Sequence, residues 1–266
     1  MRDLVLAKQF EEVIFAVKNL DGNINDKIPY KKIIIENNNE LFEIIKTENI
    51  DMIVIDNYDI NYEFEKELHK FTKVMVVDDF YQKHYCDILL NHNIYAQKDK
   101  YLDLVPSFCE IRCGKKYTLI REEFKISKKF PKTNKNFTIF VAMGGADTAN
   151  LTIPIIEILK DYKCEINVVT TSANKNLDNL KDIKNINLYI NSNEIAKIMR
   201  NSDLAIVTPS VILNEVFYME MDFIAIQTAD NQQEMRNYLK KNNFKVLEKF
   251  DGEKLKNELN KFCKLK

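Results

Sequence analysis

The chain has 266 residues, 45% of them hydrophobic, which is enough to bury the cores of two modest domains. Its 39 basic and 40 acidic side chains give a net charge of −1, so no chain-wide field recruits nucleic acid or an acidic membrane. No apolar run reaches the length of a membrane span, and five scattered cysteines without a signal peptide favour a soluble, cytoplasmic protein.

The first half of the chain alternates apolar strands with amphipathic helices, which predicts a doubly wound α/β domain. Residues 2–12 have helical spacing, whereas a parallel sheet normally starts with a strand, so we expect a segment to be missing in front. Residues 101–112 are expected to be irregular, and 113–121 to be the last element of this half. Strands are expected at residues 13–17, 32–35, 51–56, 73–79 and 87–91, and helices at 39–48 and 62–72.

The second half repeats the alternation after a lysine-rich polar stretch, residues 122–136, which Pro131 interrupts. We therefore predict an N-terminal domain over residues 1–125, a linker over 126–136 and a C-terminal domain over 137–266. Two such halves imply a cleft between them. Strands are expected at residues 137–143, 166–171, 186–190, 203–208, 223–227 and 245–248, and helices at 151–160, 177–183, 194–201, 211–219, 233–242 and 253–266.

A paired glycine, Gly144 and Gly145, ends the first apolar run of the second half. Without a Cβ, the backbone turns sharply and a phosphate can approach it, and the N–H groups of the following helix favour an anion. Asp147 and Thr148 are suited to cap that helix. A glycine pair alone is a weak signal, so a tight turn without a ligand remains an equal alternative.

Two further polar segments follow strands of the second half. Ser210 is expected to cap a helix in which Asn214 and Glu215 lie one turn further on. A carboxylate there can accept hydrogen bonds from the vicinal hydroxyls of a ribose, or can simply be an acid favoured by the helix dipole. The loop at residues 229–233 offers amides that either address a sugar or a phosphate, or cap the next helix.

In the first half, carboxylates gather at predicted strand ends, where paired acids can bind a metal or act as acid and base. Asp78 and Asp79 are adjacent, so in an extended strand they point to opposite faces and only one can serve a given site. Structural roles are expected for the three histidines, with the imidazole of His69 solvated. Cys109 and Cys113 have no second pair to complete a zinc site, and we predict neither a metal nor a cofactor.

Five ordered segments together resemble one known family. They are DD at 78–79 followed by HYCDILLNHN at 84–93, CGKKYTLIREEF at 113–124, MGGAD at 143–147, SVILNE at 210–215 and DNQ at 230–232. In these segments the chain is similar to the hydrolase family of the pseudaminic acid pathway, which acts on UDP-2,4-diacetamido-2,4,6-trideoxy-β-L-altropyranose. The resemblance implies two Rossmann-like domains of the glycosyltransferase B type, as in MurG, and hydrolysis of a UDP-sugar by water at the anomeric carbon without a metal.

The resemblance also implies roles for individual residues. Gly144, Gly145 and Asp147 would line the diphosphate, and Glu215 would hold the ribose, with Ser210 and Asn214 nearby. Tyr58 and Asn231 would face the sugar as catalytic residues, and Gln232 would bind substrate. Asn57 stands where some relatives have histidine, so the pocket can differ there.

The main departure from the family pattern is at the start of the chain. The family begins with a strand and a G-x-G-H loop, and its general-base histidine would fall two residues before Met1. The absence of that strand predicts unpaired neighbouring strands and exposed apolar surface in the first half. Two alternatives to a hydrolase therefore remain open: a glycosyltransferase that uses another acceptor, and a UDP-sugar binding protein without turnover. The oligomeric state is left undefined.

Overall fold

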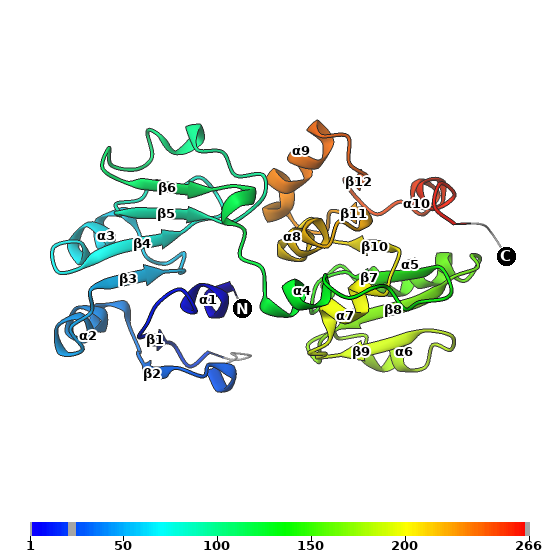
Figure 1. Cartoon of the computed structure of the whole chain (residues 1–266), viewed down its shortest axis with the longest axis horizontal. Coiled ribbons are helices and arrows are strands. Elements are labelled where there is room, and N and C mark those ends of the chain that lie inside the picture. The colour runs from blue at the N-terminus through cyan, green and yellow to red at the C-terminus, as the bar shows by residue number, and fades with distance from the viewer. Residues whose placement is uncertain (1, 21–24, 264–266) are drawn as a thin grey trace. The chain divides into compact units, whose positions relative to one another are not determined.

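The computed structural model describes residues 2–20 and 25–263, so Met1 and any position before it lie outside the described part. The chain divides into two compact units, Met1–Leu119 (unit 1) and Ile120–Lys266 (unit 2), labelled by element in Figure 1. The division falls earlier than the predicted linker at 126–136. Helix α4 (Glu122–Ser127) lies where the sequence predicted the end of the first domain and the start of the linker, and its Phe124 is fully buried within unit 2.

The strands of unit 1 form two separate parallel sheets. The larger has the order β3-β4-β5-β6, and the smaller pairs β1 with β2. The two sheets differ from the single doubly wound half predicted above, and among the described residues β1 and β3 each have one hydrogen-bonded neighbour. The elements are α1 (Arg2–Ala7), β1 (Ile14–Val17), β2 (Lys31–Ile34), α2 (Leu41–Thr47), β3 (Met52–Ile55), α3 (Tyr62–Leu68), β4 (Lys73–Val77), β5 (Ile88–Asn91) and β6 (Glu110–Cys113).

Two predictions for unit 1 were wrong in detail. The last strand is β6, inside the segment predicted to be irregular, and residues 115–117 of the predicted last element form a 3-10 turn instead. The helix predicted over residues 2–12 ends at Ala7. Gly114 between β6 and the turn has φ of 82°, a conformation that favours glycine and ends the strand.

Helices cover both faces of the larger sheet of unit 1. Helices α2 and α3 pack on one face, where Leu41 and Leu68 join a core with Val74, Val76 and Leu89. Helix α1 packs on the other face, where its Leu6 contacts a cluster of Met75, Val77 and Leu90. Burying an aliphatic side chain contributes about 1.5–3 kcal/mol, so this small cluster is enough to fix α1 against the strand ends.

Unit 2 is a six-stranded parallel sheet in the order β12-β11-β10-β7-β8-β9. Every predicted strand and helix is present, with ends shifted by a few residues, except that the closing helix stops at Leu259 and its predicted last residues, 264–266, lie outside the described residues. The strands are β7 (Thr138–Ala142), β8 (Glu165–Thr170), β9 (Asn187–Ile190), β10 (Leu204–Val207), β11 (Asp222–Ile226) and β12 (Val246–Leu247). The helices are α5 (Thr152–Leu159), α6 (Leu177–Lys181), α7 (Ile195–Arg200), α8 (Val211–Tyr218), α9 (Gln233–Lys241) and α10 (Gly252–Leu259).

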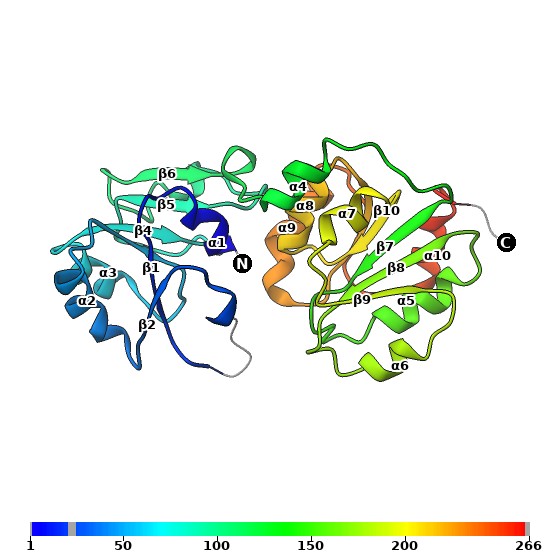
Figure 2. The same ribbon diagram turned by 60° about the horizontal axis from the view of Figure 1, so that its bottom comes forward.

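The central strands of unit 2 are buried on both faces, as their continuous apolar runs predict. Helices α5, α6 and α10 cover one face, and α7 and α8 lie on the other (Figure 2). Strand β7 pairs with both β8 and β10, so the connections leave it in opposite directions. Loops after β7 and β10 therefore flank the point where the strand order reverses, which is where open α/β sheets bind ligands.

In residues 2–20 and 25–263, no helix combines the length and the apolar character that crossing a membrane requires.

Candidate active site

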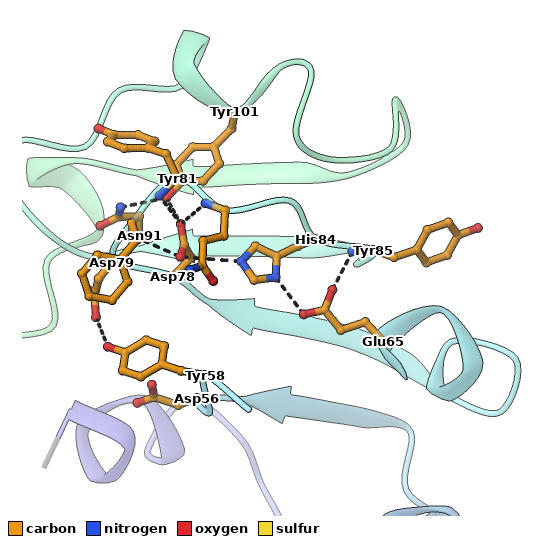
Figure 3. Close-up of polar contacts among 12 residues, drawn as sticks. Asp56, Tyr58, Glu65, Asp78, Asp79, Tyr81, His84, Tyr85, Asn91 and Tyr101 are labelled. Carbon is orange, nitrogen blue, oxygen red and sulfur yellow. Dashed lines mark hydrogen bonds and ion pairs between the residues drawn. The ribbon is translucent and has the colours of Figure 1, made fainter. Parts of the chain in front are cut away.

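In unit 1, polar side chains meet at the carboxyl ends of β3, β4 and β5 around Asp79. We call Arg2, Asp56, Tyr58, Asp79 and Asn93 the Asp79 cluster. The Asp79 carboxylate accepts hydrogen bonds from Arg2 Nη1 at 2.7 Å, Tyr58 Oη at 2.8 Å and Asn93 Nδ2 at 2.7 Å. Arg2 also donates to both oxygens of Asp56, at 2.6 and 2.8 Å. Figure 3 shows the Tyr58 hydroxyl directed at Asp79 from the end of β3.

This geometry fixes the character of the Tyr58 hydroxyl. Burial and the adjacent Asp79 carboxylate raise the pKa of Tyr58 to about 12, so the phenol keeps its proton at neutral pH. That proton is donated to Asp79, and Arg2 also donates toward the phenol oxygen, which leaves one of its two lone pairs for another donor. The side chain is 60% exposed and packs edge-on against Phe80 at 5.3 Å. Tyr58 is therefore an accessible hydrogen-bond acceptor.

His92 lies beside the Asp79 cluster but is fully buried. Its Nε2 is 3.4 Å from Arg2 Nη1, and its Nδ1 has no hydrogen-bond partner in the described residues. Burial and the Arg2 charge lower the pKa of His92 to about 4, so its imidazole is neutral. The ring is thus buried and neutral, and a structural role for His92 stays the prediction.

Asp78 belongs to a second, buried network that we call the Asp78 network: Glu65, Asp78, His84, Asn91 and Tyr101. His84 donates from Nδ1 to Glu65 at 2.7 Å, and its Nε2 lies 3.6 Å from Asp78, an ion pair rather than a hydrogen bond (Figure 3). Tyr101 donates to Asp78 at 2.6 Å, and Asn91 donates to Tyr101 at 2.8 Å.

The two adjacent aspartates therefore serve different networks, as the alternation along the strand predicted. Asp78 is 2% exposed and also accepts from the backbone N–H groups of Phe80 and Tyr81, so it stabilises the loop that follows β4. Asp79 instead accepts hydrogen bonds from Arg2, Tyr58 and Asn93. The third histidine, His69, is half-buried and pairs with Asp87 at 3.2 Å, whereas a solvated ring was predicted.

In unit 2, the paired glycines lie in the loop between β7 and α5, and each is required for a different reason. Gly144 has φ of 86°, which favours glycine, and a Cβ there would meet nothing within 4 Å. A Cβ on Gly145 would lie 3.1 Å from Thr171 Cγ2, and the Gly145 carbonyl accepts from the hydroxyls of Thr170 and Thr171. The backbone at Gly144 is exposed, so it remains available to a ligand.

Asp147 caps α5, as predicted from the sequence. Its carboxylate accepts from the backbone N–H groups of Leu151 at 3.0 Å and Thr152 at 2.9 Å. The side chain is 3% exposed, so both oxygens face the helix rather than solvent. This favours an indirect role for Asp147, holding the glycine loop, over the diphosphate contact that the resemblance implied. The helix starts seven residues after Gly145, and the loop between them holds Asp147 at φ of 43° and Asn150 at φ of 54°.

The polar residues after β10 line the start of α8. Ser210 occupies the N-cap position, but its hydroxyl lies 2.9 Å from the Thr208 hydroxyl and makes no capping bond, so the predicted cap was wrong. Asn214 and Glu215 are buried. Arg121 donates from Nε and Nη2 to the two oxygens of Glu215, at 2.7 and 2.9 Å. Burial raises the pKa of Glu215, and the Arg121 guanidinium opposes that rise.

After β11, the loop before α9 carries the remaining predicted residues. Gln232 accepts a hydrogen bond from the Thr228 backbone N–H at 2.8 Å, so its side-chain carbonyl closes the loop. Asn231 is exposed at the tip of a short 3-10 turn. Within the described ranges, no group of three His, Cys, Asp or Glu side chains is arranged to hold a metal ion.

The structure thus groups the predicted residues by unit, with Tyr58 in unit 1 and the others at the strand ends of unit 2. Sequence reasoning missed Arg2 and Asn93 in the Asp79 cluster and Arg121 opposite Glu215. Each lies far along the chain from its partner, and the Arg121 pair spans 94 residues. Charge complementarity could have suggested the two arginine pairs, and it gives no signal for the neutral Asn93 amide.

Comparison with known proteins defines the fold class. The chain is similar to Acinetobacter baumannii MurG, with a TM-score of 0.59 and 12% identity over 98% of this chain and 86% of that chain. It is also similar to the spinosyn rhamnosyltransferase SpnG, with a TM-score of 0.55 and 10% identity over 84% of this chain and 67% of that chain. At these identities the likeness concerns the fold alone. The protein is an α/β protein with two Rossmann-like domains of the glycosyltransferase B type.

No family model matches the chain. It is 39% identical to the UDP-2,4-diacetamido-2,4,6-trideoxy-beta-L-altropyranose hydrolase of Campylobacter jejuni, over 94% of this chain and 93% of that protein. The chain belongs to this hydrolase family. It is also 29% identical to an uncharacterized protein of Methanocaldococcus jannaschii, over 86% of this chain and 52% of that protein.

Proposed function

We propose that the chain hydrolyses UDP-2,4-diacetamido-2,4,6-trideoxy-β-L-altropyranose to UDP and the free sugar, as a step of pseudaminic acid biosynthesis. The observation that carries the proposal is the 39% identity with the Campylobacter jejuni hydrolase over nearly the whole of both chains. In the reaction the oxygen of a water molecule bonds to the anomeric carbon. The bond from that carbon to the phosphate oxygen breaks, UDP leaves with the electron pair, and the attacking water gives up one proton to the solvent.

Unit 2 is proposed to bind the UDP group. The exposed turn at Gly144 and Gly145 allows the diphosphate to approach the backbone after β7. Glu215 is proposed to accept hydrogen bonds from the ribose, with Ser210 and Asn214 beside it at the start of α8. These loops flank the reversal in strand order between β7 and β10, which supports the assignment.

Unit 1 is proposed to act on the sugar through Tyr58. Because the Tyr58 proton is donated to Asp79, the phenol oxygen can accept a hydrogen bond from an N–H of the sugar or from the attacking water. Asn231 and Gln232 are proposed to contact the sugar from the loop after β11. We propose that the reaction proceeds in the cytoplasm and without a metal.

Hydrolysis in water enriched in oxygen-18 tests the proposal. Attack at the anomeric carbon predicts that the heavy oxygen appears in the free sugar and that the released UDP keeps its normal mass. Heavy oxygen in UDP would instead show attack at phosphorus and contradict the mechanism. Sugar transferred to an acceptor other than water would favour a glycosyltransferase, and UDP-sugar binding without UDP release would favour a binding protein.

The absence of a metal requirement has its own measurement. Dialysis against EDTA should leave the rate of UDP release unchanged. A loss of rate that added Mg²⁺ or Mn²⁺ restores would overturn this part of the proposal and leave the substrate assignment intact.

A further inference from the structure

The half-buried Arg121 and the buried Glu215 form an ion pair in which the arginine can orient the carboxylate without touching the substrate itself. We propose that Arg121 is a positioning residue for the ribose: it holds the Glu215 carboxylate so that an outer lone pair of one oxygen accepts the 2′-hydroxyl. This inference rests on the proposed function, because it assumes that Glu215 accepts a hydrogen bond from the ribose of UDP.

The hydrogen-bond geometry leaves room for such a ligand. The Nε and Nη2 atoms of Arg121 reach Oε1 and Oε2 of Glu215 at 2.7 and 2.9 Å, so the contact is a two-pronged fork. A carboxylate has about four lone-pair sites, and the fork takes one on each oxygen. One outer lone pair therefore remains on each oxygen; the two point away from each other, so each can accept a single hydroxyl.

Arg121 is itself held in place, which is what a positioning role requires. Its Nη1 lies 2.6 Å from Glu123, and its guanidinium stacks 4.9 Å from the centre of the Phe124 ring. Phe124 is fully buried and anchors α4 to unit 2. The orientation of the guanidinium is therefore set by its own surroundings before any ligand is present, and Glu215 follows it.

The charges that face Glu215 make the role testable by pH. Glu215 is 6% exposed, and the charged groups that act on it are Arg121 and Glu123. Burial and the Glu123 carboxylate both favour the protonated form of Glu215, and Arg121 alone opposes them. Without Arg121, Glu215 should bind a proton at a higher pH and lose part of its capacity to accept hydrogen bonds.

The experiment compares the affinities of the full chain for UDP and for 2′-deoxy-UDP, measured by calorimetry between pH 6 and 8.5. A hydrogen bond to a charged group supports a preference for UDP of about tenfold or more in the wild type. Arg121→Gln should reduce this preference to near unity at pH 7 and restore part of it as the pH rises. Arg121→Lys keeps the charge but loses the fork, so an intermediate preference with little pH dependence is expected.

Two comparison variants separate the possible outcomes. Arg200→Gln is a matched control, because Arg200 bonds to the Phe130 carbonyl on the exposed surface and should keep the wild-type preference. Glu215→Gln should lose the preference at every pH. If Glu215→Gln loses it while Arg121→Gln retains it, the positioning role is overturned and the proposed ribose contact stands. If Glu215→Gln retains it, the ribose contact itself fails, and the inference fails with it.

Stability measurements show whether a variant loses UDP binding because it has unfolded. Thermal unfolding of each variant, with and without UDP, shows whether unit 2 remains folded. Should Arg121→Gln unfold, the Arg121→Lys variant decides: an unchanged preference for UDP over 2′-deoxy-UDP in that variant overturns the inference, and a reduced one supports it.

Discussion

The buried imidazole of His84 should make the stability of the protein depend on alkaline pH. Burial alone would lower the pKa of His84, but the hydrogen bond to Glu65 and the negative charges of Glu65 and Asp78 outweigh it and raise the pKa to about 9. His84 is 7% exposed and Glu65 is fully buried, so solvent screens this interaction little. The perturbation that tests it is His84→Gln, which removes the titrating group and leaves the neighbouring carboxylates in place.

The magnitude follows from the shift. The pKa of His84 rises from an ordinary 6.5 to about 9, and each unit corresponds to about 1.4 kcal/mol, so the protonated ring contributes about 3 kcal/mol. Below pH 6.5 the ring is protonated in both the folded and the unfolded state, and the whole contribution is present. Between pH 6.5 and 9 the folded state alone retains the proton, so the contribution is lost as the pH rises through 9.

Urea unfolding of the wild type and of His84→Gln, repeated from pH 6 to pH 10, measures this loss. At pH 6 the variant should be less stable by about 3–5 kcal/mol, because Glu65 remains buried without its partner. The difference between the two proteins should shrink by about 3 kcal/mol at pH 10. Comparing the two proteins cancels the titration of groups that they share.

A stability difference that stays constant between pH 6 and pH 10 would refute the reasoning. If His84→Gln does not fold, nuclear magnetic resonance of the wild-type histidine rings supplies the same test. A His84 ring that loses its proton near pH 6.5 instead of near 9 would show that Glu65 and Asp78 do not hold its charge.

Three further predictions concern the neighbouring sites. The pKa of His92 is lowered to about 4 by burial and Arg2, so its ring resonances should not shift between pH 8 and pH 5, and stability should fall below pH 6.5 because the unfolded state binds the proton more readily. Asp147→Ala should lower the free energy of unfolding by about 0.5–2 kcal/mol in urea titrations, because α5 loses its cap. Tyr58→Phe should change the free energy of unfolding by less than about 1 kcal/mol, because the side chain is exposed. The same variant should lower kcat for UDP release about tenfold or more. An unchanged kcat would remove Tyr58 from the proposed mechanism.

The sequence was most informative where strands are buried on both faces. Strands such as β7 and β10 of unit 2 are continuous, almost entirely apolar runs, and their predicted positions were confirmed within a few residues. Strand β6 was missed because its four residues, Glu110–Cys113, include two charged side chains and none is fully buried. Short, half-exposed strands carry too little apolar pattern to be separated from loops.

Site residues were predictable only as far as local rules reach. Asp147 was predicted to cap α5, and its carboxylate does accept from the first N–H groups of the helix, although the N-cap residue itself is Leu151. Ser210 has a similar local pattern, but its hydroxyl hydrogen-bonds with the Thr208 hydroxyl instead of the helix. A rule based on sequence spacing does not predict this alternative partner. Arg121 was assigned to the first half of the chain, and its contact with Glu215 depends on how α4 packs within unit 2.

The carboxylates at these strand ends share a property that limits what they can offer a substrate. Asp79 accepts from three side chains, and Glu215 accepts a two-pronged contact from Arg121. Each carboxylate is thus largely used by the protein itself, and what it can offer a substrate is the lone pairs that remain. Replacing either one by its amide reverses a hydrogen bond from acceptor to donor without a change of shape. Such a variant should therefore disturb the internal donors as well as the substrate, and a loss of activity in Asp79→Asn or Glu215→Gln identifies a substrate contact only when ligand discrimination changes with it.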